Sequence, residues 1–177
     1  MPCSANDLVN WAKSQIGVTE DPKGSNNVVY NTHYYNRVIN NPNYAWCAVF
    51  IWDGLRQCGA SELYYDGGRT AYVPALVDWA RKNNLVVTNP QPGDIVVFDW
   101  DTPKGGGDHV AICIDSTHDT ITTIDGNVSD AVKQCIRNRT EVLMFIRPKY
   151  TVPTISHKCN VDTCPVVAYL KSLIKEV

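Results

Sequence analysis

The chain has 177 residues, of which 44% are hydrophobic and 19% are charged, and its formal net charge is −2. This length suits one domain with a real core, and the composition is that of a globular protein. A pI near 6.0 leaves no electrostatic footprint for nucleic acid or anionic lipid, so we expect neither as a partner. The sequence also lacks the pattern of a secretory signal peptide or of a membrane span, so we expect no membrane insertion.

The first predicted helix begins after Ser4. Ser4 and Asp7 form a capping-box pattern, in which a hydroxyl and a carboxylate satisfy the free N–H groups of the first turn. Gly17 is the predicted end, and the apolar stripe of this helix consists of Leu8, Ala12 and Ile16. The stripe predicts a scaffold helix that packs on the core.

Residues 19–42 are rich in Asn and Tyr, which predicts a surface loop. An alternative interpretation is a groove wall whose aromatic faces pack against sugar or peptide, formed by Tyr30, Tyr34 and Tyr35. We expect His33 in this loop to be exposed. The acidic residues 20–21 lack the ligand spacing of a calcium loop, so we expect no metal here.

Residues 46–58 predict a helix with a cysteine in its first turn. Apolar residues recur at helical spacing, and Gly59 follows as a stop. At this position the unpaired backbone N–H groups and the positive end of the helix dipole favour a thiolate over a thiol. Cys47 is therefore a candidate nucleophile, while a buried structural cysteine is the ordinary alternative in an apolar helix.

The chain has seven cysteines, an odd number that does not suit a secreted disulfide framework. One catalytic thiol, together with structural thiols made in a reducing cytoplasm, is the simpler interpretation. Three cysteines fall in apolar helix or strand patterns, and we expect them in the core: Cys58, Cys113 and Cys135.

A helix over residues 73–82 is followed by a series of short strands. The first strand follows a turn within residues 92–100, and the apolar runs and alternating patterns of the others cover residues 109–115, 120–124, 132–136 and 143–146. Helices first and strands second predict an α+β fold, in which N-terminal helices pack on an antiparallel sheet of five to six strands.

Two of these strands carry candidate catalytic residues at their ends. His109 opens one strand, and Asp125 and Asn127 follow the next. With Cys47 they form the order Cys, His, Asp/Asn. A Cys–His pair needs a third polar group to fix the imidazole tautomer, and the ends of adjacent strands can hold such groups in register. The pattern predicts nucleophilic catalysis with His109 as the base.

From Tyr150 the composition is that of a linker, and an apolar helix pattern continues to the end. Three candidate zinc ligands lie between this linker and the predicted helix: His157, Cys159 and Cys164. A fourth ligand is missing, and their spacing is not that of a usual zinc site. A local disulfide between the two cysteines is a second alternative, and a plain docking helix is the favoured one.

The motifs resemble the CHAP domain, the cysteine- and histidine-dependent amidohydrolase/peptidase family of peptidoglycan hydrolases. The matching segments are residues 44–50, 92–95, 109–111 and 125–127. Upstream of them, residues 16–20 and 25–35 resemble the segment that precedes the nucleophile in phage lysins of this family. The resemblance implies a papain-like fold of the NlpC/P60-CHAP type over residues 1–149. Residues 150–177 would then be a linker and docking helix, or the remnant of a wall-binding module.

The resemblance implies that Cys47 attacks an amide of peptidoglycan while His109 transfers the protons. The bond would be that of an N-acetylmuramoyl-L-alanine amidase or of a stem or cross-bridge endopeptidase. Asp125 or Asn127 would orient His109. The family usually has Glu where this chain has Asp125, a side chain one methylene shorter, so either the backbone moves closer or the amide does more of the orienting.

We expect Tyr44 and Trp46 to contact the substrate or the oxyanion, and we expect no metal and no cofactor. The expected partner is bacterial peptidoglycan, with the chain acting as a monomer. A phage endolysin made in the host cytoplasm and released through a holin fits better than a secreted bacterial autolysin or effector. Two other interpretations stay open: a non-catalytic wall-binding module that keeps this fold, and a transglutaminase-type transfer through the same Cys–His pair.

Overall fold

The computed structural model describes residues 3–100 and 105–150. Within this part of the chain, four α-helices precede most of the sheet: α1 (Ala5–Ser14), α2 (Val29–Tyr35), α3 (Cys47–Gln57) and α4 (Val73–Lys82). The strands are β1 (Val86–Val87), β2 (Ile95–Phe98), β3 (His109–Ser116), β4 (Thr120–Asp125), β5 (Lys133–Asn138) and β6 (Val142–Ile146). Short 3₁₀ turns lie at Ser61–Leu63, Tyr65–Gly67 and Arg139–Glu141. The predicted α+β class with an antiparallel sheet is confirmed.

The six strands form one sheet in the order β1-β6-β2-β3-β4-β5, and every neighbouring pair is antiparallel. In the register of β3 and β4, Ile112 lies opposite Ile124. The start of β3 therefore lies beside the end of β4, which places His109 and Asp125 at the same end of the sheet. This register is what brings two predicted site residues together.

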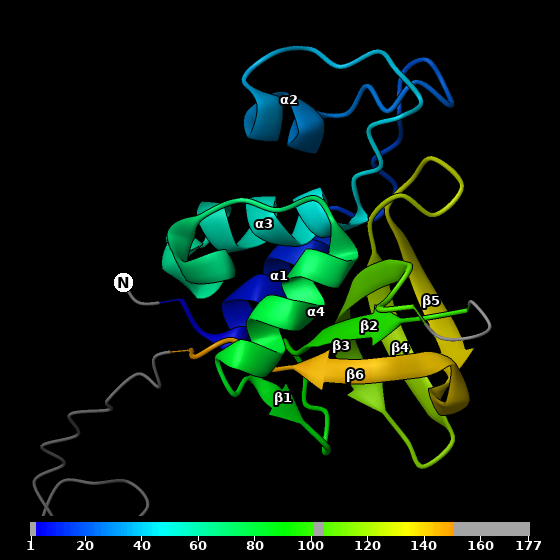
Figure 1. The fold of residues 1–177 in the computed structure, drawn as a ribbon. Coiled ribbons are helices and arrows are strands. Elements are labelled where there is room, and N and C mark those ends of the chain that lie inside the picture. Colours follow the sequence, from blue (N-terminus) through cyan, green and yellow to red (C-terminus); the bar gives the residue numbers. More distant parts are fainter. Residues whose placement is uncertain (1–2, 101–104, 151–177) are drawn as a thin grey trace, which may run out of the picture.

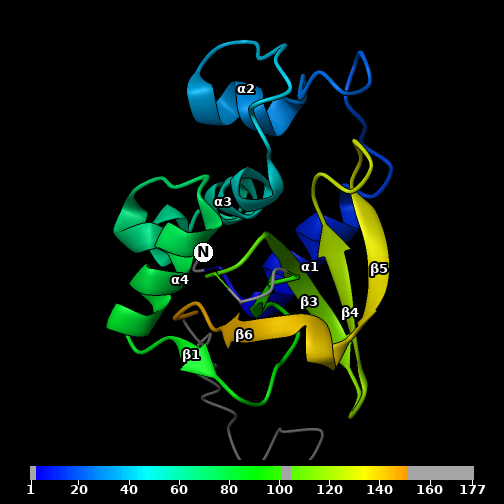
Figure 2. The ribbon, with the colours of Figure 1, turned by 45° about the vertical axis from the view of Figure 1, so that its right-hand side comes forward.

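Helices α1 and α3 pack on the sheet at β3. Figures 1 and 2 show α3 between the outlying α2 and the sheet. The two helices approach closely at Gly54, where an added Cβ would lie 2.5 Å from the Trp11 ring. The predicted capping box at Ser4 and Asp7 is present. The predicted stripe is wrong for Ile16, which is 45% exposed because α1 ends before it.

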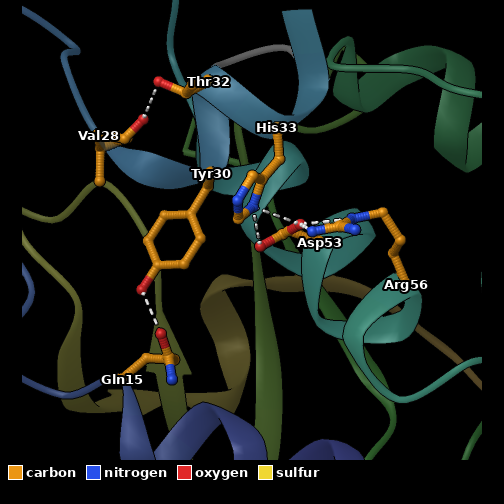
Figure 3. Close-up of polar contacts among 7 residues, drawn as sticks. All are labelled: Gln15, Val28, Tyr30, Thr32, His33, Asp53 and Arg56. Atoms are coloured by element: carbon orange, nitrogen blue, oxygen red, sulfur yellow. Dashed lines mark hydrogen bonds and ion pairs between the residues drawn. The ribbon is translucent and has the colours of Figure 1, made fainter. Parts of the chain in front are cut away.

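The predicted surface loop over residues 19–42 is wrong in part, because it contains α2. Tyr30 is 1% exposed and its hydroxyl donates to Gln15 Oε1 at 3.1 Å, so its ring is core and not a groove wall (Figure 3). Asn36 takes a left-handed conformation at the C-terminus of α2. The asparagines around α2 favour a loop prediction, so the apolar face of this short helix was not recognised from the sequence.

Cys113 is fully buried, as predicted, whereas Cys58 and Cys135 are only half-buried, which corrects the prediction that all three are core. Among the helices that the structure describes, none is long and apolar enough to cross a membrane. The predicted C-terminal helix and the three candidate zinc ligands near Cys159 lie outside the described residues.

Candidate active site

Cys47 is the first residue of α3, with Trp46 as its N-cap residue. The Trp46 side chain is fully buried: its indole donates to Glu20 Oε1 at 2.7 Å and its ring packs on Tyr30 at 5.5 Å. The expected contact of Trp46 with substrate is therefore corrected, because the ring has no surface to offer a ligand. Its role is to fix the loop that leads into α3, and thus the position of Cys47.

His109 is the first residue of β3, and its side chain is 10% exposed. Its Nε2 lies 2.9 Å from Asp125 Oδ2, which leaves Nδ1 as the second polar atom of the ring. Burial lowers the pKa of His109, but hydrogen bonds with Asp125 and with the Cys47 thiol, and the charges of both groups, raise it to about 9. The imidazole thus lies between a carboxylate and a thiol.

Asp125, at the end of β4, is fully buried and has three partners. Besides His109, its Oδ2 pairs with Arg137 Nη1 at 2.7 Å, and its Oδ1 accepts from the Thr123 hydroxyl. A carboxylate held on this many sides keeps its orientation, and so does the imidazole bound to it. A buried charge of this kind is tolerated because it is paired and hydrogen-bonded.

Arg137 is a site residue that the sequence analysis missed. It belongs to β5, its side chain is 15% exposed, and its guanidinium lies over the Phe98 ring at 4.7 Å and the Trp100 ring at 5.9 Å. It lies twelve positions after Asp125 in the chain, and no spacing rule connects the two. Only the pairing of β4 with β5 places an arginine there.

Trp100 forms an exposed aromatic wall beside His109. Its ring stacks on the imidazole with 5.8 Å between centroids and 25° between planes, and it is 49% exposed. The indole N–H donates to Glu141 Oε2 at 2.9 Å, which fixes the ring orientation. A half-exposed tryptophan against the imidazole offers an apolar face to a ligand that reaches His109.

Gly126 lets the end of β4 approach α3. A Cβ built at this position would lie 2.6 Å from Phe50 Cβ and 2.9 Å from the Trp46 ring, a separation that real side chains do not adopt. A glycine directly after Asp125 is therefore what allows the carboxylate end of the sheet to lie against the helix that begins with Cys47.

Two predicted site residues are not joined to this cluster. Asn127 takes a left-handed backbone with φ of 66°, and the described hydrogen bonds of His109 go to Asp125 and not to this amide. The Tyr44 hydroxyl accepts from Arg37 at 3.0 Å, and its ring packs against Tyr35 at 4.9 Å. Tyr44 therefore has other described contacts, and the carboxylate of Asp125, not the amide of Asn127, is the described partner of the imidazole.

The described residues contain no group of three or more His, Cys, Asp or Glu side chains placed to hold a metal ion. Glu20, which the sequence raised as an acidic candidate, uses both carboxylate oxygens as acceptors, from the Trp46 indole and from the Asn26 backbone. The chemistry that the cluster supports is a thiol nucleophile with an oriented imidazole as its acid and base.

Comparison with known proteins agrees with this chemistry. Residues 39–127, half of the chain, match the family model described as CHAP domain. No curated protein matches the chain.

Two solved structures are similar: the crystal structure of Ly7917, with a TM-score of 0.46, and that of Ly7917 with the hydrolyzing product of MDP, with a TM-score of 0.48. Each is 16% identical, and the match covers 82% of this chain. It spans only 62% and 63% of those chains, respectively. It is the family match, with Cys47 and His109 inside its range, that assigns the chain: this protein belongs to the CHAP domain family.

Proposed function

We propose that this chain hydrolyses an amide bond of bacterial peptidoglycan through a covalent thioester on Cys47. The observation that carries the proposal is the position of His109, whose ring is hydrogen-bonded to buried Asp125 and whose pKa is raised by the neighbouring Cys47 thiol as well as by that carboxylate. Family membership supports peptidoglycan as the substrate class. The bond is that of an N-acetylmuramoyl-L-alanine amidase or of a stem or cross-bridge endopeptidase.

In the proposed mechanism, His109 takes the thiol proton and the Cys47 sulfur attacks the amide carbonyl carbon. The tetrahedral intermediate collapses as the C–N bond breaks, and the imidazolium gives its proton to the leaving amine. Water, deprotonated by His109, then attacks the thioester and releases the acid and the thiol. Asp125 holds the imidazole throughout and stabilises its charged form.

The backbone N–H of Cys47 is the proposed donor to the oxyanion. As the first residue of α3, Cys47 has an N–H with no partner inside the helix, and this group lies beside its own sulfur. One such donor is typically worth about 3 kcal/mol in the transition state. Tyr44 remains a proposed contact for substrate at the same loop.

The burial of the other described cysteines supports Cys47 as the nucleophile. Burial raises the thiol pKa of Cys3 and of Cys113 to about 12, and it also raises the thiol pKa of Cys58 and Cys135. These thiols therefore contain little thiolate near neutral pH. A thiol-directed alkylating reagent should modify Cys47 first.

The test is mass spectrometry of the fragments released from purified peptidoglycan, with Cys47→Ala beside the wild type. New L-alanine N-termini identify an amidase, and new termini within the stem or bridge identify an endopeptidase. Cys135→Ala, which removes a half-buried thiol on β5, is the matched control and should release the same fragments. Equal release by Cys47→Ala, or none by the wild type, would contradict the proposal and favour a wall-binding module.

The biological setting is a further part of the proposal. The leader resemblance at residues 16–20 and 25–35 supports a phage endolysin over a secreted autolysin. We propose residues 1–149 as the catalytic unit and residues 150–177 as an extension that hydrolysis does not need. A chain ending after Tyr150 that still releases the same fragments would support this division, and loss of release by a folded truncation would contradict it.

A further inference from the structure

A hollow of about 610 Å³ lies between α2 and α3, away from the Cys47 cluster. We call it the α2–α3 hollow, and the residues that carry the argument are His33, Arg37, Trp52, Arg56 and Arg69. Among the described residues that line it there is no Asp or Glu, although the whole chain carries a formal charge of −2. The lining of the hollow is therefore positively charged.

A buried carboxylate holds two of these side chains, His33 and Arg56, in place. Asp53 is 1% exposed and contacts His33 Nδ1 at 3.0 and 3.1 Å, while Arg56 Nε donates to the same carboxylate at 2.8 Å (Figure 3). The bond through Nδ1 leaves His33 Nε2 as the second polar atom of the ring, and His33 lines the hollow. The contact with Asp53 corrects the prediction that His33 is exposed.

The other two arginines are held by aromatic rings and by single hydrogen bonds. Arg69 lies over the Trp52 ring at 5.0 Å and donates to the Tyr34 carbonyl, and Arg37 lies over the Tyr44 ring at 5.7 Å. Each guanidinium has five N–H donors, so most of them stay available. Stacking fixes the planes of these groups and lowers the entropy cost of binding a ligand.

We propose that the α2–α3 hollow is a binding site for a phosphate group. Three guanidinium groups and one imidazole line it, a donor set that suits a compact oxyanion with several acceptor oxygens. The buried carboxylate offsets one positive charge, so the lining keeps a net positive charge for the ligand. The phosphate can be a free ion or a phosphodiester of a polymer, and both share this chemistry.

The experiment is a titration of the full chain with inorganic phosphate at constant ionic strength, followed by NMR of the His33 ring and the Trp52 indole. We expect saturable shifts of both signals, and no such shifts with chloride. Arg37→Gln with Arg69→Gln should weaken binding about tenfold or more, because each removes a charged hydrogen-bond donor. Arg37→Gln alone serves if the double variant does not fold.

Arg81→Gln is the matched control. Arg81 is exposed on α4, and its charged contact among the residues that the structure describes is a long one with Asp78, so the variant removes the same charge from another surface. Unchanged affinity supports a built site. Shifts that rise linearly without saturation, an equal response to chloride, or equal weakening by Arg81→Gln would overturn the proposal.

A second titration distinguishes the two sources of phosphate. An oligomer of glycerol phosphate joined by phosphodiesters should bind if the ligand is a polymer, whereas binding of inorganic phosphate alone assigns the site to a free phosphate. Cys47→Ala should bind phosphate as the wild type does. The failure of this site and the failure of the proposed hydrolysis are therefore separate results.

Discussion

Two His–Asp–Arg clusters lie within the described residues, and they differ in what the second ring nitrogen of the histidine can reach. In each, an aspartate less than 2% exposed lies between an imidazole and a guanidinium: Asp125 with His109 and Arg137, and Asp53 with His33 and Arg56. His109 contacts a thiol at the start of a helix, whereas His33 lines a hollow surrounded by arginines.

The comparison indicates that a buried carboxylate is a general means of orienting an imidazole and an arginine. The chemistry comes from the group that the oriented imidazole faces: a nucleophile allows covalent catalysis, and further cations favour the binding of an anion. The side chains of the two histidines also differ in exposure, at 10% for His109 and 33% for His33. The more buried ring is the one beside the Cys47 thiol.

The strongest test of this difference is His109→Ala. Because the proposed mechanism uses this imidazole in every proton transfer, we expect kcat/KM for peptidoglycan fragments to fall about a thousandfold or more. His118→Ala is the control, since the His118 side chain is 98% exposed on a turn, and it should change little. Similar rates for the two variants would remove His109 from the mechanism.

Asp125→Asn should lower activity about a hundredfold or more and also change its pH dependence. The pKa of His109 is raised to about 9, so the imidazolium that holds the thiol proton and gives it to the leaving amine is kept below that pH and is lost as the pH rises through it. Asp125 contributes a hydrogen bond and a charge to this shift. Its replacement should therefore move the alkaline decline of kcat/KM to lower pH, whereas an unshifted decline would argue against the coupling.

Gly126→Ala tests whether the close approach of β4 to α3 creates the catalytic cluster. The added Cβ meets Phe50 at 2.6 Å, so we expect a loss of about 2 kcal/mol in the free energy of unfolding, together with reduced kcat. Gly105→Ala is the matched control, because its Cβ has open space. Denaturant unfolding of the two variants should separate them, and equal stability would show that the contact is easily relieved.

The smallest expected effects are on stability, and they concern the arginines of the two His–Asp–Arg clusters, Arg137 and Arg56. Arg137→Met should cost about 2 kcal/mol, because it leaves buried Asp125 with one fewer charged partner, and Arg56→Met should cost less than about 1 kcal/mol. The reason is exposure, at 15% for Arg137 and 36% for Arg56. Thermal unfolding measures the difference, and a larger loss for Arg56→Met would reverse this ranking.

Arg137→Met has a second readout that a purely structural role would not affect. The positive charge of Arg137 lies on the same carboxylate oxygen as the imidazole and opposes protonation of His109. Its removal should move the alkaline decline of activity to higher pH, opposite to the effect of Asp125→Asn. A shift in the same direction for both variants would contradict this assignment.

The sequence by itself determined most of the helices and strands, and it located both members of the catalytic pair, Cys47 and His109. The helix at residues 73–82 has the predicted bounds, α3 begins at Cys47 within the predicted helix, and His109 opens β3 as expected. These features depend on apolar periodicity and on start and stop residues within one short segment, and such signals are local. The Cys–His order also sufficed to predict a thiol mechanism.

Only the tertiary structure decided which side chains meet. The sequence left Asp125 and Asn127 as alternatives, and the register of β3 with β4 places the Asp125 carboxylate on the ring. The sequence analysis did not identify Arg137 as a site residue. Strand register and side-chain direction join residues with no constant spacing, so a local pattern does not encode them.

The same reason explains the wrong predictions for Trp46 and His33, which lie in the helical part of the fold. Trp46 was expected at the substrate, but the loop after residue 19 folds back and buries its indole against Glu20. His33 was expected in solvent, but α2 packs on α3 and brings it to Asp53, twenty residues away. Burial of a polar or aromatic side chain depends on which distant segment covers it, and that is determined by the packing of the whole domain.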